Sequence, residues 1–273
     1  EVYTNNVIDS ISKLSIILTG IFFESLIYAA LLFFIISILK SIIFIYYYYL
    51  NKMYLVFSLR KSSIKGVKKL FKLSLGHSAE LLAALMKHNG QIFLLGIFFG
   101  PQIIAYVSTC KTLFYFFPVR ILATLNNVSM FEYAQTFAKK KISNLKYNHK
   151  AHILFIIVLL LLFLIASTTI GPFIYKIWLN NKFNLSFIFL LIIAFDASLY
   201  LLRTSIIIPL KSLNRFFVLG IVELFFIFIA MLVSYYFLSL GYSFISHFII
   251  ILICTFIILL ISTYIVGKSY KNI

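Results

Sequence analysis

Long runs of apolar residues, separated by short polar stretches, dominate the chain of 273 residues. A helix needs about 20 such residues to cross about 30 Å of hydrocarbon. No stretch alternates apolar and polar residues with the period of a strand. The pattern therefore predicts an all-α fold, a polytopic transmembrane helix bundle. The expected spans are residues 7–28, 31–50, 68–99, 102–125, 151–171, 185–208, 216–238 and 244–266.

Two apolar segments depart from a simple single span. An unbroken helix over residues 7–50 would be about 66 Å long, about twice the hydrocarbon core, so we expect a tight turn that divides it in two. The segment 68–99 is amphipathic in its first half and apolar in its second. This favours one long helix whose first half faces water or other helices. In the next span, Pro118 is expected to kink the helix.

Basic residues concentrate in alternate loops. Residues 51–72 contain seven Lys or Arg and residues 135–150 contain five, whereas the loops at 100–102 and 240–242 contain none. Basic and uncharged loops thus alternate in step with the expected spans. The positive-inside rule places the basic loops and both ends of the chain in the cytoplasm.

Composition narrows the class of protein. The chain is 63% hydrophobic and 11% charged, against about 45–50% and about 25% for soluble domains. These values exclude a soluble enzyme or binding module, and also a disordered chain. The net charge of +17 would suggest nucleic acid as the partner of a soluble protein. Here the basic residues lie between apolar runs, so we expect membrane lipids and no nucleic acid as partners.

Familiar catalytic and metal-binding patterns are missing from the sequence. Cys110 and Cys254 lie in apolar surroundings and predict neither a disulfide framework nor a metal site. There is no phosphate-binding G-x-x-x-x-G-K-[ST] motif and no H-E-x-x-H motif. We therefore expect no ATPase activity, no catalytic residue, no metal and no cofactor.

Ionisable residues inside the apolar spans are the candidates for function, because a charge in hydrocarbon is costly. Helical spacing places several of them in stripes. Lys111 shares a face with Ser108, Thr112 and Tyr115, whereas Arg120 joins that face only if the helix kinks at Pro118. Seven residues are candidate substrate-binding residues: His77, Glu80, Lys87, Lys111, Arg120, Asp196 and Arg203.

Each of these residues also has a purely structural interpretation. Asp196 and Arg203, seven residues apart and hence on one face about 10 Å apart, could neutralise each other or a neighbouring helix. His77 and Glu80 could lie near the cytoplasmic surface, where a polar face needs no ligand. Lys87 and Arg120 could extend to the membrane interface.

Several motifs resemble those of bacterial polysaccharide flippases of the multidrug/oligosaccharidyl-lipid/polysaccharide exporter superfamily. Residues 89–112 read NGQIFLLGIFFGPQIIAYVSTCKT, similar to the family signature G-x-x-L-G-P-x-x-V-A-x-[YF]-S-x-x-R-T-L. Residues 171–178 and 213–215 resemble the family's G-x-x-I-x-x-x-W loop and A-x-N-R turn. Glu132 stands where the family often has an acidic residue. Lys111 replaces the usual Arg, which keeps the charge but loses the bidentate fork.

The resemblance implies a domain organisation. Residues 68–266 resemble the six-helix C-terminal lobe of the family, and residues 1–50 its last two N-terminal-lobe helices. Residues 51–67 would then be a basic cytoplasmic linker and residues 267–273 a cytoplasmic tail. The chain opens with a polar run and no Met, so we expect it to be a C-terminal fragment.

The resemblance also implies a function. Such proteins flip undecaprenyl-pyrophosphate-linked oligosaccharide across the bacterial inner membrane for lipopolysaccharide O-antigen and related surface polysaccharides. They work by alternating access. Their partner is the lipid-linked oligosaccharide, and the polysaccharide polymerase and chain-length machinery are candidate partners. Lys111 would contact the pyrophosphate from a hydrated cleft.

Two other functions remain open. A cation-coupled multidrug or small-molecule antiporter of the same superfamily would favour intramembrane carboxylates, which are few here. A membrane enzyme, such as a polymerase or acyltransferase, would need an outer loop large enough for a site of its own. The loop at 172–184 is too short for that.

Overall fold

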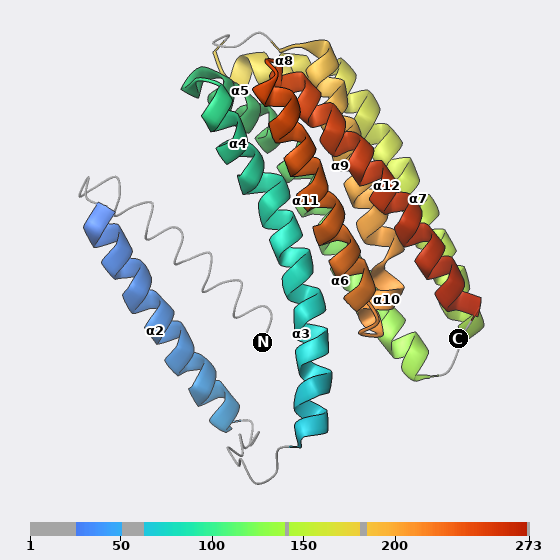
Figure 1. Cartoon of the computed structure of the whole chain (residues 1–273). Helices are drawn as coiled ribbons and strands as arrows, with labels where there is room; N and C mark the ends of the chain where they lie inside the picture. Colours follow the sequence, from blue (N-terminus) through green and yellow to red (C-terminus); the bar gives the residue numbers. More distant parts are fainter. Residues whose placement is uncertain (1–25, 51–62, 140–141, 181–184, 272–273) are drawn as a thin grey trace. The chain divides into compact units, whose positions relative to one another are not determined.

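The computed structural model describes residues 26–50, 63–139, 142–180 and 185–271. The chain divides into two compact units, residues 1–63 and 64–273, which are described separately. Every regular element among the described residues is a helix (Figure 1). The predicted all-α helix bundle is therefore confirmed.

The described part of the first unit is a single helix, α2, from Leu26 to Leu50. It runs through residues 29–30, where a turn was expected, because this stretch has neither Gly nor Pro to end a helix. The expected span at 31–50 lies within α2. The expected span at 7–28 lies outside the described residues except for its last three.

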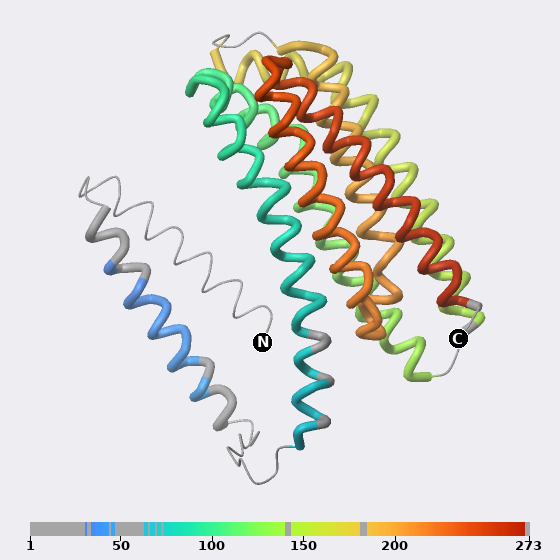
Figure 2. The backbone as a smooth tube through the Cα atoms, in the orientation of Figure 1, coloured from blue at the N-terminus to red at the C-terminus, as the bar shows by residue number. Residues whose placement is uncertain are grey.

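The second unit is a bundle of helices that run alternately in opposite directions (Figures 1 and 2). Its elements are α3 (Ile64–Leu85), η2 (Met86–Gly90), α4 (Gln91–Phe98), α5 (Pro101–Lys111), η3 (Thr112–Phe116), α6 (Phe117–Ala138), α7 (Ile142–Thr169), α8 (Gly171–Trp178), α9 (Phe187–Ile206), α10 (Ile208–Ser212), α11 (Phe217–Ser239) and α12 (Phe244–Lys271).

Five of the described helices are long and apolar enough to cross a membrane. They cover Ser74–Phe98, Ser143–Thr169, Phe187–Ile206, Phe217–Ser239 and Phe244–Tyr270. Helices of this kind indicate a membrane-embedded protein. The helix expected at 102–125 exists but continues to Ala138 and is more polar, and the apolar part of α2 is short. The expected count of eight spans stays a prediction.

Two π-helical turns interrupt the long helices. The helix predicted at 68–99 is present from Ile64 to Phe98, with the π-turn η2 in its middle. The second π-turn, η3, ends two residues before Pro118, and the Phe117 N–H donates to the Thr112 carbonyl five residues earlier. Proline has no N–H and cannot continue the α-helical hydrogen bonds, which accounts for an irregular turn beside it. The kink expected at Pro118 stays a prediction.

The turn between α4 and α5 follows directly from its sequence. Phe99 and Gly100 are extended, and for Gly100 the reason is that the residue before a proline is disfavoured in the helical region. Pro101 then occupies the first turn of α5, where its fixed φ suits a helix start. The Gly-Pro pair of the flippase-like motif therefore ends one helix and begins the next.

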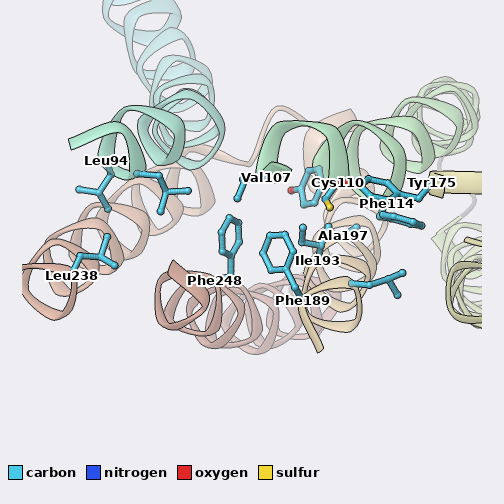
Figure 3. Packing of buried hydrophobic residues seen from close by; sticks show 13 residues of the cluster. Leu94, Val107, Cys110, Phe114, Tyr175, Phe189, Ile193, Ala197, Leu238 and Phe248 are labelled. Atoms are coloured by element: carbon cyan, nitrogen blue, oxygen red, sulfur yellow. The ribbon is translucent and has the colours of Figure 1, made fainter. Parts of the chain in front are cut away.

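An aromatic core fills the end of the bundle near this turn (Figure 3). Phe189 of α9 and Phe248 of α12 meet edge to face, with ring centroids 4.9 Å apart. Val107 and Cys110 of α5 pack against them. The core fixes α5, α9 and α12 to one another at this end.

The backbones of helices α3 and α11 come into direct contact at two glycines, Gly76 and Gly220. A Cβ added to Gly220 would lie 2.2 Å from the Gly76 carbonyl oxygen, and one added to Gly76 would lie 2.7 Å from the Phe217 Cα. Neither neighbour is a flexible side chain, so any larger residue must push the two helices apart.

Gly220→Ala should therefore destabilise the bundle by about 1–3 kcal/mol, the usual cost of overpacking. The midpoint of thermal denaturation of the purified protein in detergent measures the effect. Gly267→Ala, where a Cβ meets nothing within 4 Å, is the control. Equal midpoints for the two variants would contradict a tight crossing at this point.

Charge divides the two ends of the second unit. One end holds the starts of α3, α7 and α11 and the ends of α6, α10 and α12 (Figure 1). These segments contain Lys68, Lys139, Lys146, Lys150, Lys211, Arg215, Lys268 and Lys271. Among the described residues the opposite end has Lys176 of α8 as its charged side chain. The first is called the basic end below.

The positive-inside rule predicts that the basic end faces the cytoplasm. Single cysteines at Tyr242 and Lys268, with Cys110 and Cys254 replaced by serine, test this with a membrane-impermeant maleimide. We expect Tyr242→Cys to react in intact cells and Lys268→Cys to react only after permeabilisation. The reverse pattern would invert the topology.

Candidate functional site

The centre of the second unit holds a buried ion pair between α9 and the π-turn η2. The Lys87 Nζ lies 2.8 Å from Asp196 Oδ1 and also donates to the Thr255 hydroxyl of α12 at 2.9 Å. That hydroxyl donates to the same carboxylate oxygen at 2.7 Å. Lys87 is 3% and Asp196 8% exposed. Three helices are thus joined by one closed triangle of polar contacts.

A second buried pair lies two turns further along α9. The Arg203 Nη1 lies 2.7 Å from Glu223 Oε1 of α11, and Arg203 Nε donates to the Ser262 hydroxyl at 3.4 Å. Arg203 is 2% and Glu223 4% exposed. Of the open alternatives, Asp196 and Arg203 thus neutralise neighbouring helices rather than each other.

A third ion pair joins α10 to α3 in the half of the bundle nearer the basic end. The Lys211 amine of α10 contacts the Glu80 carboxylate of α3, and both side chains are partly buried. Glu80 and Lys87 are seven residues apart on α3 and η2, as Asp196 and Arg203 are on α9, which corresponds to about 10 Å. The second and third pairs therefore both lie about 10 Å nearer the basic end than the central pair, at a similar depth in the bundle.

Lys111 lies beside the central pair. It is 4% exposed, and its Nζ donates to Gln91 Oε1 at 2.6 Å. The same Nζ lies 5.8 Å from the ring centroid of Tyr115, and the Lys87 Nζ lies 5.4 Å from that centroid. In the described part of the chain the Lys111 amine pairs with no carboxylate, and it does not reach the surface of the unit.

The other two predicted residues lie at the surface. His77 and Arg120 are exposed, and the His77 ring meets Phe216 edge to face at 6.2 Å. Because Lys111 is buried and Arg120 is exposed, the two do not share a face. The structure thus brings Lys87, Asp196 and Lys111 together and leaves His77 and Arg120 apart from them.

Several buried polar residues were missed at the level of sequence. Glu223 is a carboxylate inside an apolar span, so the rule that selected Asp196 should have selected it too. Buried polar atoms without a hydrogen-bond partner among the described residues include the Tyr115 hydroxyl, His88 Nδ1 and both ring nitrogens of His247. No spacing pattern distinguishes these residues from other polar side chains on apolar helices.

A cavity of about 190 Å³ opens between α3, α6, α9 and α10, in the half of the bundle nearer the basic end. The Glu80–Lys211 pair forms part of its wall. Five hydrogen-bonding or charged side chains line it together with Tyr200 and apolar residues: Glu80, Asn126, Asn127, Thr204, Lys211, Tyr200, Val119, Ala123, Met130, Leu201 and Ile208. Apolar atoms make up most of the lining, and the polar groups are set among them.

Asn126 is held in place by three neighbours on two helices, α7 and α9. Its amide nitrogen donates to Thr204 Oγ1 at 3.3 Å. Its oxygen accepts from the Ser205 hydroxyl at 3.0 Å and lies 3.2 Å from His152 Nε2 of α7. This network fixes one wall of the cavity.

Comparisons of the chain with protein-family models, with curated proteins and with solved structures find no match. The resemblance to polysaccharide flippases therefore depends on the motifs of the sequence. The long apolar helices indicate a membrane protein, and the buried charges and the cavity are compatible with transport.

The central pair yields a test by charge removal. Lys87→Met should destabilise the bundle by about 3–5 kcal/mol, because it leaves the Asp196 carboxylate buried without its cation. The double variant Lys87→Met/Asp196→Leu should recover most of that loss. Thermal denaturation in detergent measures both, with the exposed Lys150→Met as control. A double variant no more stable than Lys87→Met would show that the pair is not coupled.

Proposed function

We propose that the chain belongs to a bacterial inner-membrane transporter that flips undecaprenyl-pyrophosphate-linked oligosaccharide for surface polysaccharide synthesis. The observation that carries the proposal is a cavity with polar groups in its wall, set among apolar helices in the half of the bundle nearer the basic end. A lipid-linked sugar needs a protected polar place for its head while its tail stays in lipid. The flippase-like motifs supply the substrate class.

The ion pairs support alternating access. Flipping by this mechanism needs a lobe that rocks as one body against another. The three pairs tie α3 and η2, α9, α10 and α11 to one another, and Thr255 and Ser262 add α12. These ties favour rigid-body motion of residues 64–273 over motion within them.

The same pairs disfavour the alternative, a cation-coupled antiporter. Such a transporter needs an intramembrane carboxylate that can take up a cation. Asp196 and Glu223 already hold Lys87 and Arg203. In the described spans, these two carboxylates thus already bind cationic side chains of the protein and are not free to bind a transported cation.

Among the predicted substrate-binding residues, Arg120 is the one we assign to the first contact with the pyrophosphate. It is exposed on α6, three positions before Ala123 of the cavity wall. A guanidinium suits phosphate oxygens because it donates two parallel hydrogen bonds. Lys111 would take part only when its surroundings open.

A complementation experiment tests the proposal. In a strain lacking its own flippase, the full-length protein should restore surface glycan, and Arg120→Glu should lower that glycan at least about tenfold at normal expression, a loss of about 1.4 kcal/mol. Arg120→Lys should retain activity, and Lys176→Glu at the opposite end is the matched control. No restoration by the wild-type protein, with drug resistance conferred instead, would favour the antiporter.

A further inference from the structure

The cavity at the basic end is too small for a whole oligosaccharide. Its volume of about 190 Å³ lies below the 300–1,000 Å³ of pockets for drug-sized ligands. One sugar ring is a suitable size. The rest of a glycan would have to extend through the opening.

The charges of the lining select a neutral ligand. The Lys211 ammonium and the Glu80 carboxylate contact each other, so together they add no net charge to the cavity. An anion such as phosphate would have to approach Glu80 as well as Lys211. The hydrogen-bonding groups favour hydroxyls, because an amide both donates and accepts.

The arrangement of the lining also suits a ring. Asn126, Asn127 and Thr204 supply polar groups, while Leu201, Ile208 and other apolar side chains supply hydrophobic contact. A pyranose has hydroxyls around its edge and C–H groups on its faces. Asn126 is already committed to Thr204, Ser205 and His152. Asn127 is exposed, with an amide not so engaged, and is the side chain that can turn to the ligand.

The order of residues along α6 shows where Arg120 lies relative to the cavity. Arg120, Ala123 and Asn127 are spaced three and four residues apart, which places them along one face of the helix. Because α6 runs toward the basic end (Figure 1), Arg120 lies about 10 Å farther from that end than Asn127, next to Val119 at the far edge of the cavity wall. A phosphate at Arg120 would thus be followed, toward the basic end, by a ring in the cavity.

We propose that this cavity binds the sugar ring directly attached to the pyrophosphate of the lipid-linked cargo, with Asn127 as a recognition residue. The proposal depends on the proposed function and specifies where the cargo enters. The glycan beyond the first ring extends toward the basic end. The polyprenyl tail stays on the lipid side of Arg120.

Cysteine protection in nanodiscs tests the site directly. The full-length protein carries Ala123→Cys in the cavity wall, with Cys110 and Cys254 replaced by alanine, and maleimide alkylation is timed. Polyprenyl-pyrophosphate-linked glucose, galactose and N-acetylglucosamine are compared with sugar-free polyprenyl pyrophosphate and with the free sugars. We expect at least one sugar-bearing lipid to slow alkylation about tenfold, with the sugar-free lipid and free sugars slowing it less than twofold.

Two matched variants on α6 test whether the protection from alkylation arises in the cavity. Asn127→Leu should remove most of the protection, whereas Gln135→Leu, on an exposed position of the same helix outside the cavity, should leave it unchanged. A cysteine at Lys139, at the end of α6, should show no protection. Equal protection by sugar-bearing and sugar-free lipid, or by free sugar, would overturn the assignment.

A flipping assay in proteoliposomes with the same lipids separates the two proposals. Transport of a sugar-bearing lipid without protection of Ala123→Cys overturns the cavity assignment and leaves the flippase function standing. Protection without transport overturns the flippase function and leaves the cavity as a sugar site.

Discussion

The neutralisation of charge inside apolar helices is the constraint on which the second unit depends. A lone charge in hydrocarbon is costly, so each buried carboxylate of the described spans has a cationic partner on another helix. The Lys87–Asp196 pair, with Thr255 as a third member, fixes η2, α9 and α12 in rotation and depth. Apolar packing alone would tolerate sliding of these helices. The ion pairs set their register.

Backbone irregularities make this register possible. The close contact at Gly76 and Gly220 brings α3 against α11 without side chains between them. About three turns after Gly76, the π-turn η2 contains Lys87. A π-turn adds a residue to the helix and so rotates the next helical segment by about 100°. This rotation separates the face of α3 that contains Glu80 from the face of α4, where Leu94 and Leu95 join the aromatic core.

Apolar spacing predicted the long helices well because their boundaries follow the lipid. The expected span at 185–208 corresponds to Phe187–Ile206, and that at 216–238 to Phe217–Ser239. Apolar spacing did not predict that α6 continues past residue 125 to Ala138. That part of the helix is polar, and a polar helix that is stabilised by packing has no hydropathy signal. Spacing also identified Lys87 and Asp196 as residues of interest. It could not pair them, because their contact spans 109 residues of sequence and helical periodicity does not say which faces meet.

Lys111 is a buried lysine that takes no part in the three ion pairs. Asp196 contacts Lys87 and Thr255 directly, and among the described residues no carboxylate forms an ion pair with the Lys111 amine. Lys111 instead donates to Gln91 and lies over the rings of Tyr115 and Phe116. Aromatic faces stabilise an ammonium without neutralising it. Among the buried lysines and arginines of the described unit, Lys111 is therefore the one without a carboxylate partner.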